Sequence, residues 1–283
     1  MKIKLFNSIL FVLLPTLLLA QDGRVFDNLV LPSKILKMDR KYAVYLPPGY
    51  ETSNRSYPVL YLLHGSGDDQ SGWVQLGEVN LIADKAIKEG KSTAMIIIMP
   101  DANTGHRGYF NTINGNFPYE DFFFKELIPF VEKTYRVRAE KKFRFVSGLS
   151  MGGGGTIVYA LHHPEMFAAA CPMSAGVGLQ DLESTRQMLK KANPTISDEQ
   201  IDAYNKQHNG IELVNNLPED QIKSVRWYID CGDDDPRSES NSKLHMAMNK
   251  KGIAHQFRIS DGGHTWTYWR ASLPEVLKFI SDF

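Results

Sequence analysis

The hydrophobic positions of this chain follow two different patterns. Residues 24–46 partly alternate apolar and polar side chains and are interrupted by Pro32, which predicts an antiparallel pair of strands over 24–31 and 33–46. From residue 58 onward the apolar runs are continuous, as in 58–63 and 94–100, which is typical of strands covered on both faces. The change predicts a sheet that begins antiparallel and becomes parallel.

Helical patterns alternate with further apolar runs as far as the C-terminus. The expected helices cover 76–89, 119–135, a stretch from 151 to Pro164, 240–251 and 273–283, and the further strands cover 143–149, 167–173, 225–231 and 254–259. Strands that alternate with helices indicate a mostly parallel sheet with helices on both faces. With no internal repeat, residues 21–283 are expected to form a single α/β domain.

Residues 179–223 depart from this alternation, because they are polar and helix-prone and lie between two expected strands. Two interpretations stay open: a cap or lid over a site, or a long solvated excursion.

The N-terminus carries the features of a secretory signal peptide. A short basic lead precedes an apolar run over 5–19, too short to span a bilayer, and small residues end at Ala20. Cleavage of residues 1–20 predicts a secreted or periplasmic protein without stable membrane insertion, and an uncleaved anchor is the alternative.

The charges of the chain balance. The 32 Lys and Arg residues equal the 32 Asp and Glu residues in number, so nothing points to a nucleic-acid partner. The oligomeric state is left open.

The two cysteines, Cys171 and Cys231, each end an apolar run. Two buried thiols are the expected state, and a disulfide between neighbouring strands is the alternative.

A sharp strand-to-helix turn at Ser150 carries the chain's strongest chemical motif. Ser150 lies in GxSxG over 148–152, between an apolar strand pattern and a helical one. Glycines on both sides allow a strained elbow that exposes the hydroxyl, which predicts a nucleophile. The alternative is a serine that only caps the helix. Walker and dinucleotide-binding patterns do not fit the glycine run, so phosphate binding is not expected.

Two loops that follow later strands supply partners for this serine. His264 lies on a glycine-rich loop after the last expected strand, and an imidazole there would serve as general base. Asp233, Asp234 and Asp235 follow the strand ending at Cys231, and one of them can orient that imidazole. A solvated turn or a cation site is the other interpretation of the three acids.

A third loop, over 64–69, carries the small residues that an oxyanion hole needs. By position, the backbone N–H groups of Met151 and Ser66 are its expected donors. His64 is expected to anchor this loop structurally.

These motifs, in this order, resemble esterases of the α/β-hydrolase superfamily that include feruloyl and acetyl-xylan esterases of carbohydrate esterase family 1, esterase D and mycolyl transferases. The resemblance covers nearly all of the mature chain and rests on 61–65, 119–129, 148–153, the acid three residues after Gly232, and 262–264 followed by Trp266 and Trp269. It implies an α/β-hydrolase fold, Ser150 as nucleophile, His264 as base, Asp235 as the triad acid, and Ser66 and Met151 as oxyanion donors.

The implied activity is a serine esterase that uses an acyl-enzyme and needs no metal or organic cofactor. Export together with the family favours feruloyl or acetyl esters on hemicellulose; the alternatives are an acyltransferase to a sugar or lipid hydroxyl, or a non-catalytic carbohydrate-binding homologue. Among aromatic and amide side chains near the site loops, we expect substrate contacts from Trp73, Asn103, Tyr109, Trp266 and Trp269. The alternative is that half or more of these aromatic residues only anchor the loops.

Overall fold

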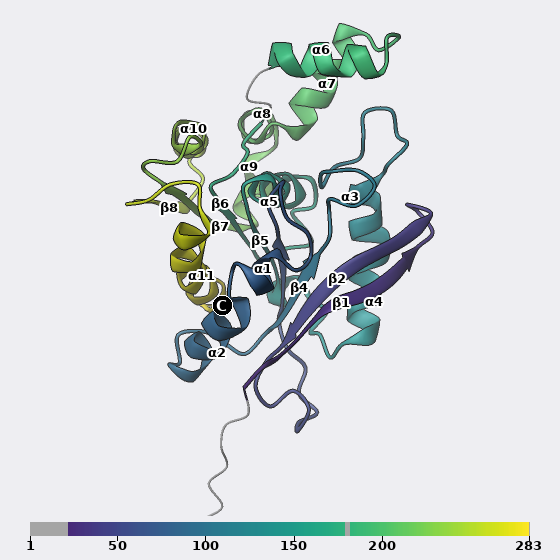
Figure 1. The fold of residues 1–283 in the computed structure, drawn as a ribbon. Coiled ribbons are helices and arrows are strands. Elements are labelled where there is room, and N and C mark those ends of the chain that lie inside the picture. Colours follow the sequence, from purple (N-terminus) through teal and green to yellow (C-terminus); the bar gives the residue numbers. More distant parts are fainter. Residues whose placement is uncertain (1–21, 179–181, 283) are drawn as a thin grey trace, which may run out of the picture.

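A mixed sheet forms the centre of the molecule (Figure 1). The computed structural model describes residues 22–178 and 182–282. Within these ranges eight strands lie in the order β1-β2-β4-β3-β5-β6-β7-β8. Their bounds are Arg24–Ser33 for β1, Met38–Leu46 for β2, Val59–Leu63 for β3, Ile96–Pro100 for β4, Arg144–Leu149 for β5, Ala169–Met173 for β6, Arg226–Gly232 for β7 and His255–Ser260 for β8.

The strand directions confirm the fold class expected from the two hydrophobic patterns. β2 is antiparallel to both β1 and β4, and every pair from β4 through β3 to β8 is parallel. The expected break at Pro32 is wrong, because β1 continues through it and Pro32 pairs with Asp39. β1 lies at the edge of the sheet. Proline is tolerated there, because no strand on the outer side needs a hydrogen bond from its missing N–H.

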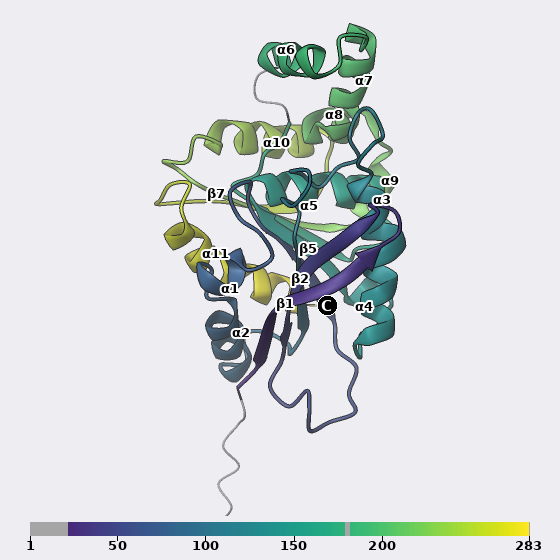
Figure 2. The same ribbon diagram turned by 45° about the vertical axis from the view of Figure 1, so that its right-hand side comes forward.

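Helices cover both faces of the sheet (Figure 2). Along β3, Val59, Tyr61 and Leu63 face one hydrophobic core, and Leu60 and Leu62 face the other. The first core is covered by α3 (Tyr119–Phe122), the π-helical turn η1 (Phe123–Leu127), α4 (Ile128–Thr134), α5 (Met151–His162) and α10 (Ser238–Lys250). The second core is covered by α1 (Gly72–Gln75), α2 (Val79–Lys88) and α11 (Trp266–Ser281). Burial on both faces explains the continuous apolar runs.

Two helix boundaries differ from the sequence-based expectation. The helix expected over 76–89 is α2, which begins only at Val79 because Glu78, the residue before it, takes a left-handed conformation with φ 52°; the short helix α1 lies before the expected range. The last helix begins at Trp266 rather than at residue 273, since the Thr265 hydroxyl caps it by accepting a hydrogen bond from Tyr268 N–H at 3.4 Å. Trp266 and Trp269 are therefore helical residues, not loop residues.

The segment between β6 and β7 is largely helical where it is described. It contains α6 (Leu182–Ala192), α7 (Asp198–His208), α8 (Gly210–Asn216) and α9 (Glu219–Lys223), and α6 with the start of α7 projects from the body of the molecule (Figures 1 and 2). Arg186 of α6 binds Asp198 and Asp202 of α7 at 2.6 and 2.8 Å. Among the described residues, no hydrogen bond or ion pair joins this segment to the side chain of Ser150 or His264.

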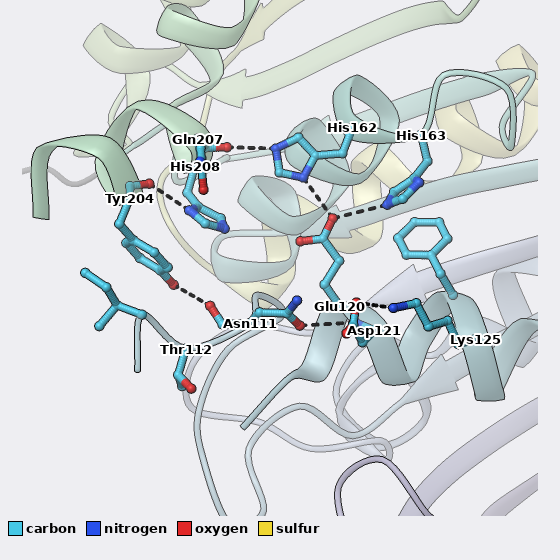
Figure 3. A pocket seen from close by; sticks show the side chains of 12 residues that line it. Asn111, Thr112, Glu120, Asp121, Lys125, His162, His163, Tyr204, Gln207 and His208 are labelled. Atoms are coloured by element: carbon cyan, nitrogen blue, oxygen red, sulfur yellow. Dashed lines mark hydrogen bonds and ion pairs between the residues drawn. The ribbon is translucent and has the colours of Figure 1, made fainter. Parts of the chain in front are cut away.

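The C-terminal end of α5 holds α7 through His162 (Figure 3). The imidazole lies 2.8 Å from Glu120 Oε1 through Nδ1 and 2.8 Å from the Gln207 carbonyl oxygen through Nε2. Both partners are acceptors, so both ring nitrogens must donate and the ring is an imidazolium. Burial disfavours this charge, but the hydrogen bond and negative charge of Glu120 outweigh it and raise the pKa of His162.

The stability of this contact is expected to depend on pH. Because the pKa of His162 is raised, its contribution is complete below about pH 6.5 and is lost as pH rises through the folded-state value. Burial raises the pKa of Glu120, but hydrogen bonds from His162 and His163 outweigh it and lower that pKa to about 2. The Glu120 contribution is therefore present above about pH 4.5 and is lost as pH falls toward its folded-state pKa.

His162→Gln should accordingly lower Tm most between about pH 5 and 6.5 and progressively less toward pH 9. Thermal unfolding of the wild type and the variant across this range measures the difference. His163→Gln is the matched control, because His163 lies farther from Glu120, at 3.3 Å, and does not reach α7. A Tm difference that stays constant with pH would contradict the assignment of His162 as an imidazolium.

Three further expectations concern cysteines and membrane segments. Cys171 and Cys231 are free and buried, which confirms the thiol interpretation over the disulfide. The described part of the chain contains no helix that is both long and apolar enough to cross a bilayer. The expected signal peptide, residues 1–20, lies outside the described residues.

Candidate active site

Ser150 lies at the turn between β5 and α5, at the carboxyl ends of the parallel strands. Its backbone is strained for a non-glycine residue, with φ 54° and ψ −113°, and the residue is only 5% exposed. Ser150 N–H donates to the Met173 carbonyl at 3.0 Å, and the Ser150 carbonyl accepts from Gly154 and Gly176 N–H at 3.0 and 2.9 Å. The bonds to Met173 and Gly176 tie the strained turn to β6 and to the loop that follows it.

The flanking glycines allow the close approach that this turn requires. A Cβ atom at Gly152 would lie 2.6 Å from the Leu63 carbonyl oxygen and 2.7 Å from the His64 carbonyl oxygen. At Gly148 it would lie 2.7 Å from Leu63 Cβ and from the Gly152 backbone. Both distances are shorter than any side chain tolerates, so the motif packs α5 directly against the end of β3.

His264 connects Ser150 to a buried carboxylate. It lies on the loop between β8 and α11, with Nε2 2.9 Å from Ser150 Oγ and Nδ1 2.8 Å from Asp235 Oδ2. Asp235 is 2% exposed, and its other oxygen accepts from Arg237 N–H at 2.8 Å. A carboxylate can only accept, so Nδ1 carries the proton and Nε2 is left to accept from the serine hydroxyl.

The structure distinguishes the three consecutive acids by their partners. Asp233 and Asp234 are exposed and their side chains do not contact His264. Asp233 Oδ1 instead accepts from Gly262 N–H at 2.9 Å, and Asp234 N–H donates to the Gly262 carbonyl at 3.0 Å. These bonds fasten the acid loop to the histidine loop. Of the three acids left open by the motif alone, Asp235 is the one that the fold brings to the imidazole.

The loop after β3 lies against Ser150 on the opposite side. His64 is 1% exposed, donates from Nδ1 to the Gly65 carbonyl at 2.7 Å, and accepts at Nε2 from Ala102 N–H at 2.9 Å. Burial is the main cause that lowers the pKa of His64, so its ring is neutral. Ser66 follows on this loop and is exposed. Met151 is the first residue of α5, where the backbone N–H has no hydrogen-bond acceptor within the helix.

Three of the five expected substrate contacts are corrected by their burial. Trp73 is 0% exposed and donates from Nε1 to the Leu63 carbonyl at 3.0 Å. Tyr109 is 1% exposed, and its hydroxyl accepts from His64 N–H at 2.8 Å. Trp269 is 5% exposed. All three pack beneath the site loops as anchors, and only Asn103, which is exposed, and Trp266, which is half-buried, present surface to a ligand.

Trp269 has a position that the sequence did not reveal. Its ring meets the His264 imidazole edge-on, with centroids 4.9 Å apart and planes at 87°. Its Nε1 donates to Ser174 Oγ at 2.9 Å, and Ser174 follows β6 with a left-handed φ of 45°. The indole thereby supports the imidazole between β6 and α11. No local motif indicates this contact, because it depends on α11 beginning at Trp266.

Comparison with known proteins gives consistent matches across the chain. Residues 33–280 match the family described as "Putative esterase". An endo-1,4-beta-xylanase/feruloyl esterase of Xylanibacter ruminicola is 39% identical over 246 residues, which cover 84% of this chain and 28% of that protein. A ferulic acid esterase structure superposes with a TM-score of 0.81 at 34% identity and covers 92% of this chain and 98% of its own. An acetyl esterase of Caldicellulosiruptor saccharolyticus is 21% identical over 271 residues, 88% of this chain and 95% of that protein.

The chain spans less than a third of the length of the Xylanibacter protein and of a 39% identical Mycobacterium tuberculosis esterase. The S-formylglutathione hydrolase structure from Staphylococcus aureus, at 19% identity and a TM-score of 0.74 over 93% of this chain, shows the same fold. The family match covers far more than half of the chain and includes all the loops described above. The chain therefore belongs to this esterase family and has the α/β-hydrolase fold.

Proposed function

We propose that this protein is a serine carboxylesterase that removes feruloyl or acetyl groups from hemicellulose side chains, with Ser150, His264 and Asp235 as its catalytic triad. The observation that carries the triad is the continuous hydrogen-bond chain from Ser150 Oγ through both ring nitrogens of His264 to Asp235, at 2.9 and 2.8 Å. The substrate class is supported by the printed names of the feruloyl esterase and acetyl esterase relatives.

Acylation begins when Ser150 Oγ attacks the ester carbonyl and His264 Nε2 takes the hydroxyl proton. The C–O double-bond electrons move to the carbonyl oxygen, which becomes an oxyanion. The backbone N–H groups of Met151 and Ser66 are the proposed donors to that oxyanion. When the carbonyl re-forms, the bond to the alcohol breaks, and His264 returns its proton to the leaving oxygen.

Deacylation repeats the same steps with water. His264 Nε2 removes a proton from water as the oxygen attacks the acyl-enzyme, and then protonates Ser150 Oγ as the acid leaves. Asp235 stabilises the imidazolium that forms twice in each cycle. Its burial makes the interaction strong, and its bond from Arg237 N–H fixes the carboxylate that selects the Nδ1–H tautomer.

The surface beside the loop 64–69, the oxyanion loop, supports a sugar hydroxyl as the leaving group. A hollow of about 250 Å³ there is lined by Asn103 and by Asp68 and Asp69 of the oxyanion loop. Amide and carboxylate groups accept hydrogen bonds from hydroxyls, and half-buried Trp266 offers an aromatic face. Such a substrate is a polymer outside the cell, which agrees with the proposed signal peptide over 1–20.

A substrate panel tests the assignment. Methyl ferulate, acetylated xylan and p-nitrophenyl butyrate would be compared by kcat/KM, and at least one of the first two is expected to exceed the butyrate ester by about tenfold, or about 1.4 kcal/mol of transition-state binding. Activity on the butyrate ester alone would contradict the hemicellulose assignment while leaving the esterase intact. Adding xylose as acceptor separates the alternatives, because acyl transfer without acid release would identify an acyltransferase.

A further inference from the structure

A second hollow lies at the opposite end of α5 from Ser150 (Figure 3). Its volume is about 400 Å³, which falls within the range of small-molecule sites. The twelve residues of α5 separate it from Ser150 by about 18 Å along the helix axis. Loop residues Asn111 and Ile113, Glu120 of α3, and Tyr204 and His208 of α7 contribute to its lining.

Two hydrogen-bond acceptors face this hollow without a protein partner. Glu120 is 8% exposed, and His162 and His163 both bind its Oε1, at 2.8 and 3.3 Å. Among the described residues Glu120 Oε2 has no partner, and Figure 3 shows it directed toward the ring of His208 across the hollow. This oxygen is therefore free to accept a hydrogen bond from a molecule in the hollow.

His208 supplies the second acceptor. Its Nδ1 lies 2.7 Å from the Tyr204 carbonyl, which can only accept, so Nδ1 carries the proton. Burial is the largest cause that lowers the pKa of His208, so the ring is neutral and Nε2 is an acceptor. Within the described part of the chain no group donates to this Nε2. Asn111 adds a donor, because its Oδ1 accepts from Asp121 N–H at 3.1 Å and its Nδ2 has no partner among the described residues.

The charges of the lining cancel in pairs. The Glu120 carboxylate faces the His162 imidazolium, and Asp121 pairs with Lys125 at 3.0 Å. A ligand with a full charge would therefore find no uncompensated partner. Nor does the cluster suit a metal ion, since no three His, Cys, Asp or Glu side chains in the described ranges are placed to hold one.

We propose that this hollow binds a neutral polyhydroxylated molecule, about one or two sugar rings in size, through Glu120 Oε2, His208 Nε2 and Asn111 Nδ2. Ligand hydroxyls donate to the two acceptors and one accepts from the amide, while Ile113 and Phe124 contact the apolar faces between the hydroxyls. The proposal goes beyond the esterase activity, because no residue of this site contacts Ser150 or His264.

Titration of the folded protein with xylobiose and with glucose tests the proposal, and glucosamine and glucuronate serve as the cationic and anionic counterparts of glucose. Amide chemical shifts are expected to move saturably at residues 111–113, 120–125 and 204–208, with a Kd on the order of 1 mM. Glucosamine and glucuronate should bind several-fold more weakly than glucose. No saturable shift in this region with xylobiose, or tighter binding of a charged probe, would overturn the proposal.

Two variants locate the binding. Ile113→Trp places a large ring in the hollow, and His208→Phe keeps an aromatic ring but removes Nε2; each should weaken xylobiose binding at least tenfold. Leu81→Trp is the matched control, because Leu81 is 62% exposed on α2, on the other face of the sheet. All three should hydrolyse p-nitrophenyl acetate like the wild type, which shows that they fold. Unchanged xylobiose binding by both pocket variants would refute the assignment.

Discussion

Ser150→Ala is expected to lower kcat on p-nitrophenyl acetate by about 10⁴-fold or more, the largest effect of any single change in this chain. Alanine removes the oxygen that would form the acyl-enzyme, and among the described residues no other side chain is hydrogen-bonded to His264 Nε2, which lies 2.9 Å from Ser150 Oγ. Residual hydrolysis would come from water activated within the remaining site. The burst of p-nitrophenol that precedes steady state should disappear as well.

The fold should tolerate this substitution. Within the described ranges Ser150 Oγ makes one hydrogen bond, to His264, which contributes about 1 kcal/mol, and the backbone bonds to Met173 and Gly176 are unaffected. Tm should therefore change little. Ser224→Ala, on an exposed loop, is the matched control and should retain full activity and fluorophosphonate labelling. Wild-type turnover by Ser150→Ala would refute the proposed nucleophile.

The sheet could be predicted from sequence because its pattern is a direct consequence of burial. Strands such as β3 are apolar at every position because helices cover both faces, whereas β1 and β2 lie toward one edge and alternate only partly. Boundaries set by a single backbone conformation could not be predicted in this way. The start of α2 after Glu78 depends on a left-handed φ, and no residue type there requires it.

The site loops could be predicted because parallel strands place their carboxyl ends at one edge, which brings the segments after β3, β5, β7 and β8 together. The sequence could not show which side chains of those loops would contact a ligand. Trp73 and Tyr109 lie on segments that follow β3 and β4. Their polar atoms form hydrogen bonds beneath the loop, from Trp73 Nε1 to the Leu63 carbonyl and from His64 N–H to the Tyr109 hydroxyl. Aromatic residues serve as anchors or as ligand contacts with the same sequence signature.

The hollow around Glu120 had no sequence signal at all. Its lining combines the loop 111–113, α3, η1, the end of α5 and the end of α7, and each contributes two or three residues without a shared motif. His162 and His208 come from segments that only the docking of α7 brings together. A site built from a few residues of each of several distant elements can be recognised only from the three-dimensional structure, because its residues have no characteristic spacing in the sequence.

Asp235→Asn is expected to lower kcat by about 10⁴-fold with little change in KM. The carboxylate accepts from His264 Nδ1–H at 2.8 Å and so leaves Nε2 free to take the serine proton. In the variant, the amide nitrogen can donate to Nδ1, which moves the ring proton to Nε2, where it blocks general-base action. The loss of negative charge also removes the stabilisation of the imidazolium by a carboxylate that is only 2% exposed.

The neighbouring acids make this test specific. Asp234→Asn makes the same chemical change one residue away, on an exposed side chain that does not contact His264, and should leave kcat within about twofold. Asp233→Asn keeps an oxygen that can accept from Gly262 N–H, so it should also retain most activity. Comparable Tm values would show that all three variants fold. If activity were lost in Asp233→Asn or Asp234→Asn but kept in Asp235→Asn, the carboxylate that orients His264 during turnover would be another one, and the loop would have to rearrange on substrate binding.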